Sequence, residues 1–289
     1  MNIEELRKLY ADGKLAKQFF PLENSVYRDG PGISFSNIKE IFEPNTPQNF
    51  KIKLGQERVA TKAMEIGTAT HLGILQHEEF IKTVRVAPDV NKRTKAGREE
   101  FQKFTEENAG KIILNNDDLE RIEGMSEKVL AHPRLSGLIN NDSNFIEHRG
   151  FFNWHNVFCK FSPDLLNRKT CLIVDLKTAQ AGHFYAFRNE IRQYHYDAQA
   201  AMYLYGARQI FNEKFQFMWL VIEKHPPFQI YLYYPSKRMI IKAFERLESS
   251  VKLIAKCYKE NKFPGVPVEA VEIDFPDYHY REETDIFNA

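Results

Sequence analysis

The feature that most constrains the fold is a series of strand-like segments that begins near residue 144 and alternates with helical patterns. NFIEHRGFFNW, VFCKF and TCLIVDL are rich in β-branched and aromatic residues and are separated by turn residues, which predicts three strands. Helical patterns follow over about residues 182–192 and 197–211, then strands at FQFMWLVIE and FQIYLYY, then a long helix over about 236–261. This order predicts an α/β fold, with a central mixed sheet of about five strands flanked by helices.

The first half of the chain predicts helices separated by turns. Ser34 is an N-cap candidate, and Asp197 is another for the helix that starts there. A longer helix is expected over about residues 56–76, and a further one begins at about residue 116 and ends before Pro133. We expect one domain over residues 1–289, with a helical N-terminal elaboration over about 1–140, the sheet core over about 141–262 and a loop-like tail over 263–289.

Composition restricts the protein class more than the function. The net charge of +1 provides no overall positive potential for nucleic acid, so a DNA-binding surface would have to be local. The three cysteines are widely spaced and form no CxxC pair, which argues against a zinc ribbon, an iron–sulfur cluster or a disulfide framework. The charged first residues and the lack of a long apolar run predict a cytoplasmic protein without membrane contact.

The residues that indicate chemistry are Asp164 and, ten residues later, the triplet Asp175-Leu176-Lys177. Asp164 is expected where one strand ends, and Asp175 follows the apolar run CLIV, so Asp175 and Lys177 share one face of the next strand. Two carboxylates and an ammonium at neighbouring strand ends form a site for Mg²⁺ that suits phosphodiester hydrolysis. The alternative is that Asp175 and Lys177 are the polar positions of a half-exposed strand, since the same acidic-x-Lys pattern occurs twice elsewhere in charged segments.

Other polar residues are candidates only in combination. His71 shares a helical face with apolar residues and points inward, where a hydrogen-bonded core histidine is the alternative to a ligand. Glu147 is expected on the first strand, where a surface carboxylate is the ordinary interpretation. Gln199 and Tyr203 are four residues apart on one helical face and could present an amide and a phenol to the same site, or simply pack. We interpret His195 as structural or DNA-facing.

Taken together, these residues resemble the PD-(D/E)xK nuclease superfamily, in particular the exodeoxyribonuclease VIII (RecE-type) branch and its phage relatives. GTATH, ending at His71, resembles the helix that carries the family's ligand histidine, and Glu147 followed by CKFSPD resembles its glutamate and aspartate strands. IVDLKT resembles the (D/E)xK motif, and YHYDAQAAMY resembles the following helix with its QxxxY signature. The match continues through VIEKHPP, is preceded by PGIS, and keeps the family order from about residue 27 to residue 265.

The resemblance implies a restriction-endonuclease-like fold and a set of roles. His71, Asp164 and Asp175 would bind Mg²⁺, with Mn²⁺ as a substitute, and the backbone carbonyl of Leu176 would be a further ligand. Lys177 would activate or orient the attacking water. Glu147 would help to position metal or water, and Gln199 and Tyr203 would touch DNA or support the lysine. The implied activity is degradation of linear double-stranded DNA from its ends in phage-type recombination, inside a bacterial host cell. The implied partners are a single-strand annealing protein and further copies of the chain in a ring-like oligomer.

One departure from the family leaves substrate preference open. Phe161 and Ser162 stand where many relatives have a glycine–arginine pair, so a supporting arginine is missing from this position. Three other functions therefore remain: a non-catalytic DNA-binding or assembly protein on the same fold, a structure-specific endonuclease, and a structural component in which the carboxylates only bridge to Lys177.

Overall fold

A five-stranded mixed sheet forms the centre of the computed structural model, which describes residues 1–56, 60–267, 269–270 and 272–274. The strand order is β10-β9-β8-β7-β4, in which β8 and β9 run parallel and the other pairs run antiparallel. The strands are β4 (Asn144–Ile146), β7 (Leu165–Asn167), β8 (Leu172–Ala179), β9 (Gln216–Glu223) and β10 (Ile230–Tyr233). The predicted α/β class with a central mixed sheet is confirmed.

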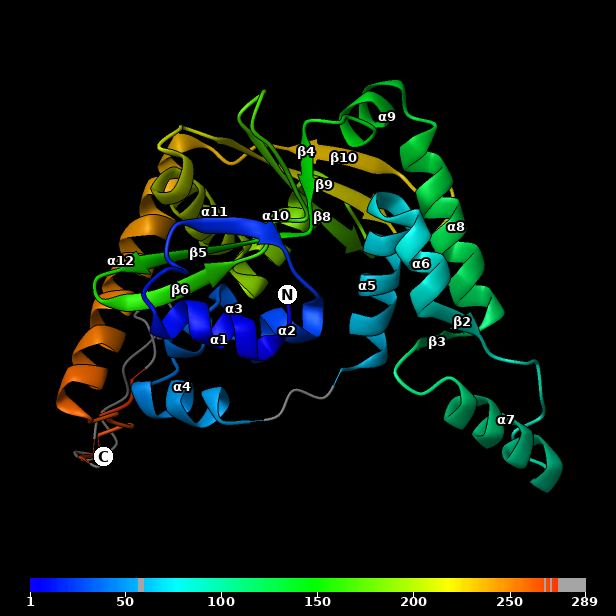
Figure 1. Ribbon diagram of the computed structural model, residues 1–289, viewed down its shortest axis with the longest axis horizontal. Helices are drawn as coiled ribbons and strands as arrows, with labels where there is room; N and C mark the ends of the chain where they lie inside the picture. Colours follow the sequence, from blue (N-terminus) through cyan, green and yellow to red (C-terminus); the bar gives the residue numbers. More distant parts are fainter. Residues whose placement is uncertain (57–59, 268, 271, 275–289) are drawn as a thin grey trace, which may run out of the picture.

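Helices cover both faces of this sheet (Figure 1). One face packs against α5 (Lys62–Leu75), α8 (Asn116–Leu130) and α9 (Pro133–Ile139), and the other packs against α10 (Phe184–Tyr194) and α11 (Tyr196–Phe211). Helix α12 (Lys237–Glu260) packs on α11. The side chains of β8 alternate between the two cores, with Ile173 in the α11 core and Val174 and Leu176 in the α5–α8 core. This alternation decides which way the polar residues of β8 point.

A second, three-stranded sheet lies beside the first. It has the order β1-β5-β6, formed by β1 (Gln18–Pro21), β5 (His148–Trp154) and β6 (Val157–Phe161). The small sheet packs closely on α11 at Gly206, where an added Cβ would lie 2.8 Å from the rings of Phe152 and Phe161. Only a glycine therefore allows this approach of helix and sheet.

The prediction of one strand over NFIEHRGFFNW was wrong. The segment forms β4 and β5, which belong to different sheets and are separated by Glu147 in a left-handed conformation, with φ of 52°. Glu147 therefore lies at a break between strands and not on a strand. Strands β1 and β7 were not predicted, because segments of three or four residues are too short to show a period.

The remaining elements surround this core. They are α1 (Ile3–Ala11), α2 (Asn24–Asp29), α3 (Phe35–Ile38), the 3₁₀ helix η1 (Lys39–Ile41), α4 (Pro47–Leu54), α6 (His77–Thr83), β2 (Val84–Val86), α7 (Lys95–Glu107) and β3 (Ile112–Leu114). In Figure 1, α7 projects away from the central sheet. The N-terminal part is thus mainly helical, as expected. Within the described residues, no helix combines the length and the apolar character needed to cross a membrane.

Most predicted helix boundaries are correct to within a few residues, but the helix expected over about 56–76 is α5, which starts only at Lys62. Ser34 and Thr61 precede α3 and α5 as N-caps. Asp197, however, does not cap α11, because the helix starts one residue earlier, after a left-handed His195 with φ of 58°. Asp197 instead lies in the first turn and accepts two hydrogen bonds of 3.0 Å from Arg246. His195 packs edge-on against Phe42, with ring centroids 5.1 Å apart. Of the expected tail, residues 268, 271 and 275–289 lie outside the described residues.

Candidate active site

Asp164 is held where β7 and β8 separate. It directly precedes β7, which pairs with β8 only as far as Leu165 opposite Val174. Beyond that point, the Asp164 carboxylate replaces a strand partner, because its Oδ2 accepts the backbone N–H of Leu176 at 2.6 Å. A strand residue directs its N–H and its C=O toward the same neighbour, so the Leu176 carbonyl also lies on this side of β8.

Asp175 and Lys177 share the face of β8 that points toward α11, as the period of two predicted. Lys177 Nζ lies 2.6 Å from Asp175 Oδ2, and the Asp175 side chain is 2% exposed. Burial raises the pKa of Asp175 to about 6, against the opposing effect of Lys177, and the negative charge of Asp164 adds to the rise. Burial alone would lower the pKa of Lys177, but the charges of Asp175 and Asp164 outweigh it and raise this pKa. The site therefore holds a fixed ammonium beside a carboxylate that resists ionisation.

Helix α5 brings His71 to the same place. His71 Nδ1 lies 3.3 Å from Asp164 Oδ1, and the imidazole side chain is 25% exposed. Burial alone would lower the pKa of His71, but the charge of Asp164 and its hydrogen bond raise it to about 9. The same interaction, with help from Lys177 and the Leu176 N–H, outweighs burial and lowers the pKa of Asp164.

Glu147 reaches the site from the break between β4 and β5. Its backbone N–H donates to the Asp164 carbonyl at 3.0 Å, and its carboxylate accepts a 2.6 Å hydrogen bond from Arg149. Arg149 is 4% exposed and also donates to the hydroxyl of Ser162 in a short contact. Burial and the charge of Asp164 raise the pKa of Glu147, with Arg149 opposing them.

Arg149 was not among the predicted site residues. The sequence signal was present, because a charged residue two positions after Glu147 stands before the apolar run GFF. Its guanidinium now occupies the space beside Ser162, so an arginine does reach this part of the site, from β5 instead of from the strand that precedes Asp164.

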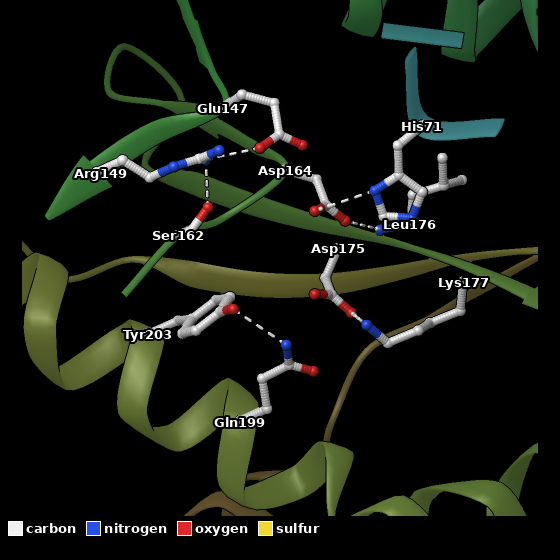
Figure 2. A network of polar contacts seen from close by, with 10 residues as sticks. All are labelled: His71, Glu147, Arg149, Ser162, Asp164, Asp175, Leu176, Lys177, Gln199 and Tyr203. Carbon is white, nitrogen blue, oxygen red and sulfur yellow. Dashed lines mark hydrogen bonds and ion pairs between the residues drawn. The ribbon is translucent and has the colours of Figure 1, made fainter. Parts of the chain in front are cut away.

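The ligand atoms of His71, Glu147 and Asp164 all lie within 4.8 Å of one another (Figure 2). An imidazole and two carboxylates are donors that a divalent cation accepts, so this group could bind a metal. The grouping differs from the expected one, which joined His71 and Asp164 with Asp175. Among the described residues, Glu147 completes the group, whereas Asp175 lies next to it and contacts Lys177.

Gln199 and Tyr203 face the site from α11, as Figure 2 shows. The amide Nε2 of Gln199 donates to the Tyr203 hydroxyl at 3.0 Å. Tyr203 is 7% exposed, and burial raises its pKa well above its ordinary value, so the phenol stays neutral. The structure thus brings all the predicted site residues into one region, and their roles remain predictions.

Comparisons with known proteins agree with this architecture. A crystal structure from Eubacterium rectale, provisionally named an exonuclease, is similar over 91% of this chain and 95% of its own, with 15% sequence identity and a TM-score of 0.60. This likeness shows the fold alone. A phage-related exonuclease from Haemophilus somnus 129PT covers 67% of this chain and 95% of its own at 11% identity, but its TM-score of 0.31 is too low to carry an argument. A search of curated proteins found no match.

The sequence profile of one family matches most of the chain. The PDDEXK-like domain of unknown function (DUF3799) matches residues 34–273, which include every residue of the candidate site. This range starts at the cap of α3 and continues beyond α12, so it contains the central sheet and the helices on both of its faces. The chain therefore belongs to this family of PDDEXK-like domains, within the PD-(D/E)xK superfamily.

Proposed function

We propose that this protein is a magnesium-dependent exonuclease that degrades linear double-stranded DNA from its ends. The observation that carries the proposal is the convergence of His71, Glu147 and Asp164 within 4.8 Å, with the Asp175–Lys177 pair beside them. Cleavage of a phosphodiester needs a cation for the phosphate and a positioned nucleophile, and this group of side chains suits both tasks. The PDDEXK-like family and the exonuclease-like fold are consistent with it.

In this proposal, His71, Glu147 and Asp164 hold Mg²⁺, and Mn²⁺ can replace it. Asp175 and the Leu176 carbonyl are the further candidates for ligands, because both lie on β8 next to the group. A bound divalent ion would polarise the phosphate and lower the pKa of a water molecule. For His71 to serve as a ligand, its imidazole must give up the proton that the raised pKa indicates, so binding of the ion and loss of this proton are linked.

Lys177 orients the attacking water or stabilises the charge that develops on the phosphate. Its ammonium has three N–H donors, of which the contact with Asp175 uses only part. Asp175 therefore fixes the lysine and leaves donors for water or phosphate oxygen. Gln199 and Tyr203 support this arrangement from α11 or contact the DNA, since both polar ends face the site.

The biological setting is proposed on the family resemblance alone. The protein would act in the cytoplasm of a bacterial host cell during phage-type recombination and pass single strands to an annealing protein. A ring-like assembly of identical chains would hold the duplex. Such an enclosure is compatible with a net charge of only +1, because a ring can retain DNA without strong attraction to each subunit.

The test is incubation of the purified protein with linear and with covalently closed circular DNA, with and without EDTA. We expect the linear duplex to be shortened from its ends in Mg²⁺, the circle to stay intact, and EDTA to stop the reaction. Nicking of the circle would instead indicate a structure-specific endonuclease. Absence of metal-dependent cleavage on both substrates would overturn the nuclease proposal.

A non-catalytic role is the second candidate, and one observation favours it. The charges of the site are already paired without an ion, since Asp175 contacts Lys177, His71 contacts Asp164 and Glu147 contacts Arg149. Calorimetric titration with Mg²⁺ separates the two functions. Heat from a saturable binding event that the Asp164→Asn variant lacks supports the enzyme, and no saturable binding supports the structural role.

Two variants assign the roles of Asp175 and Lys177. We expect Lys177→Ala to retain Mg²⁺ binding and to lose orders of magnitude in cleavage rate, because the lysine acts on water or phosphate. We expect Asp175→Ala to lose both, because its carboxylate adjoins the metal group and holds the lysine. Calorimetry and cleavage rates measure the two effects, and full activity in either variant would remove that residue from the site.

A further inference from the structure

The outermost strand of the central sheet, β10, has one unpaired side. Among the described strands it pairs only with β9. The N–H of Glu223 donates to the carbonyl of Gln229 at 3.0 Å, which fixes the alternation of hydrogen bonds along this antiparallel pair. Tyr231 therefore directs its N–H and C=O toward β9, whereas Ile230 and Leu232 direct theirs away from the sheet. These outward groups are free to pair with another strand.

The other sheet edges in the described part of the chain are protected from such pairing. Strand β4 has only three residues, β1 contains Pro21, and Ile33 pairs with β6 on its open side. Strand β10 contains no proline, and residues 226–236, PPFQIYLYYPS, include no Lys, Arg, Asp or Glu. Proteins commonly place a charge or a proline on an exposed edge to keep it from pairing with other chains. Strand β10 has neither, so its edge is suited to pairing.

Apolar side chains are exposed on both faces of the sheet beside this edge. Leu232 is on the α5–α8 face, yet its side chain is 37% exposed. On the opposite face, the Tyr233 hydroxyl donates to the carbonyl of Gly182 at 2.9 Å and ties the start of α10 to β10. The first two residues of α10, Phe184 and Tyr185, are both exposed. A strand that pairs with β10 would bring its own side chains against these apolar groups.

The free edge of β10 is complementary to a second copy of itself. Two antiparallel β10 strands with a two-fold axis at Leu232 would pair this residue with its own copy, and Ile230 with Tyr234 of the second chain. Residues two positions apart direct their backbone groups to the same side, so outward groups would meet outward groups. Because residues 226–236 carry no charge, like charges would not oppose each other across the two strands. A surface that matches itself in this way is what a two-fold interface requires.

We propose that this protein forms a two-fold dimer in which two β10 strands pair antiparallel and join the central sheets of both chains into one continuous sheet. The proposal goes beyond the nuclease function and does not depend on it, since β10 contains none of the candidate site residues. A two-fold contact uses the same surface on both chains and closes on itself. The ring-like assembly proposed above would therefore need a further, different contact.

The test places charges on the two-fold axis. Two ammonium groups would face each other in a dimer of the Leu232→Lys variant, and two carboxylates in a dimer of Leu232→Glu. We expect each variant to dimerise at least about tenfold more weakly than the wild-type protein, because like charges replace an apolar contact directly across the strands. An equimolar mixture of the two variants should dimerise again, because each lysine then faces a glutamate. Sedimentation velocity over a series of protein concentrations measures the dissociation constants.

The matched control is Leu253→Lys on α12. The Leu253 side chain is 38% exposed, against 37% for Leu232, so both variants add the same charge at equal exposure. We expect the control to change the dissociation constant of the dimer by less than about twofold. Circular dichroism and thermal unfolding verify the fold of every variant. A wild-type protein that stays monomeric at all concentrations, a mixture that does not recover, or equal losses at the two positions would overturn the proposal.

Hydrogen exchange of the wild-type protein, followed residue by residue by NMR, tests the same pairing without a substitution. On dilution from dimer to monomer, we expect the amides of Ile230 and Leu232 to lose their protection, because only the second copy provides their acceptors. The amides of Tyr231 and Tyr233 should keep theirs, because they bond to β9 in both states. A dimer in which Ile230 and Leu232 exchange as fast as in the monomer would have its interface elsewhere, and the proposal would fail even if a charged variant did not fold.

Discussion

Replacement of Lys177 by methionine removes one charge of the Asp175–Lys177 pair and leaves the other in the protein interior. Methionine keeps most of the length and apolar area of the lysine stem, so the change removes the ammonium and leaves the packing of the stem nearly unchanged. The Asp175 side chain is 2% exposed and that of Lys177 is 15% exposed. Because water cannot replace the lost partner, we expect the free energy of unfolding to fall by about 3–5 kcal/mol at pH above 7.

The matched control is Lys242→Met on α12. Lys242 and Glu245 make an ion pair of 2.7 Å, nearly the same length as the 2.6 Å pair in the site, but their side chains are 71% and 54% exposed. Exposed pairs of this kind contribute about 0–1 kcal/mol, because water solvates each partner after the other is removed. The comparison therefore varies burial at nearly constant geometry.

The effect should depend on pH with a defined sign. The pKa of Asp175 is already raised, to about 6, and without Lys177 it must rise further, because Lys177 is the largest of the effects that oppose burial and the charge of Asp164. A raised carboxyl pKa means that ionisation opposes folding, so this cost is present at high pH and disappears as the pH falls below the folded pKa. We expect Lys177→Met to be strongly destabilising near pH 8 and much less so near pH 5.

Urea unfolding in EDTA measures both quantities through the buried tryptophans. Trp219 is 1% exposed and pairs in register with Asp175, so its fluorescence reports on this part of the sheet. A loss for Lys177→Met no larger than that for Lys242→Met would refute the reasoning that burial gives the pair its importance. A loss that grows toward low pH would refute the assignment of the unpaired charge to Asp175.

Two further perturbations test packing and the histidine. Gly150→Ala should lower the free energy of unfolding in urea by about 1–3 kcal/mol or more, because the new Cβ would overlap the ring of Phe161. The control Gly137→Ala lies exposed in α9 with no atom within 4 Å of the new Cβ, so it should raise this free energy by about 0.5–1 kcal/mol. Equal effects would contradict the packing at Gly150. The His71 pKa of about 9 means that its contact with Asp164 stabilises the metal-free protein fully below about pH 6.5 and is lost as pH rises through 9. His71→Gln should therefore lower the free energy of unfolding by up to about 3 kcal/mol near pH 6 and by little near pH 10. A loss that does not depend on pH would show that the His71–Asp164 pair is not its cause.

Long apolar segments made the central sheet predictable from the sequence. Strands β8 and β9 have eight residues each, and the period of two in β8 correctly placed Asp175 and Lys177 on one face. Contact between Asp175 and Lys177 was expected only in the alternative in which the carboxylates bridge to the lysine. By contrast, β4 and β7 have three residues each, which is too few for a pattern to distinguish strand from turn.

The membership of the candidate metal group, His71, Glu147 and Asp164, could not be predicted from spacing. It depends on Glu147 adopting a left-handed conformation, which a glutamate rarely does and which no local residue signals. It depends also on whether Asp175 approaches His71 or Lys177, and in the structure its carboxylate lies 2.6 Å from the ammonium of Lys177. Arg149 was missed although it precedes an apolar run, because its contact with Ser162 joins positions 13 residues apart on different segments.

The position of Glu147 between two sheets has a consequence for how the site assembles. Its carboxylate is fixed relative to Asp164 only when the strand before it is paired in the large sheet and the strand after it is paired in the small one. A sub-global opening that releases the small sheet would therefore separate Glu147 from His71 and Asp164 while the central sheet remains folded. If His71, Glu147 and Asp164 hold a divalent ion as proposed, its binding should slow native-state hydrogen exchange in β5 more than in β9, because release of β5 is what separates Glu147 from the other two side chains.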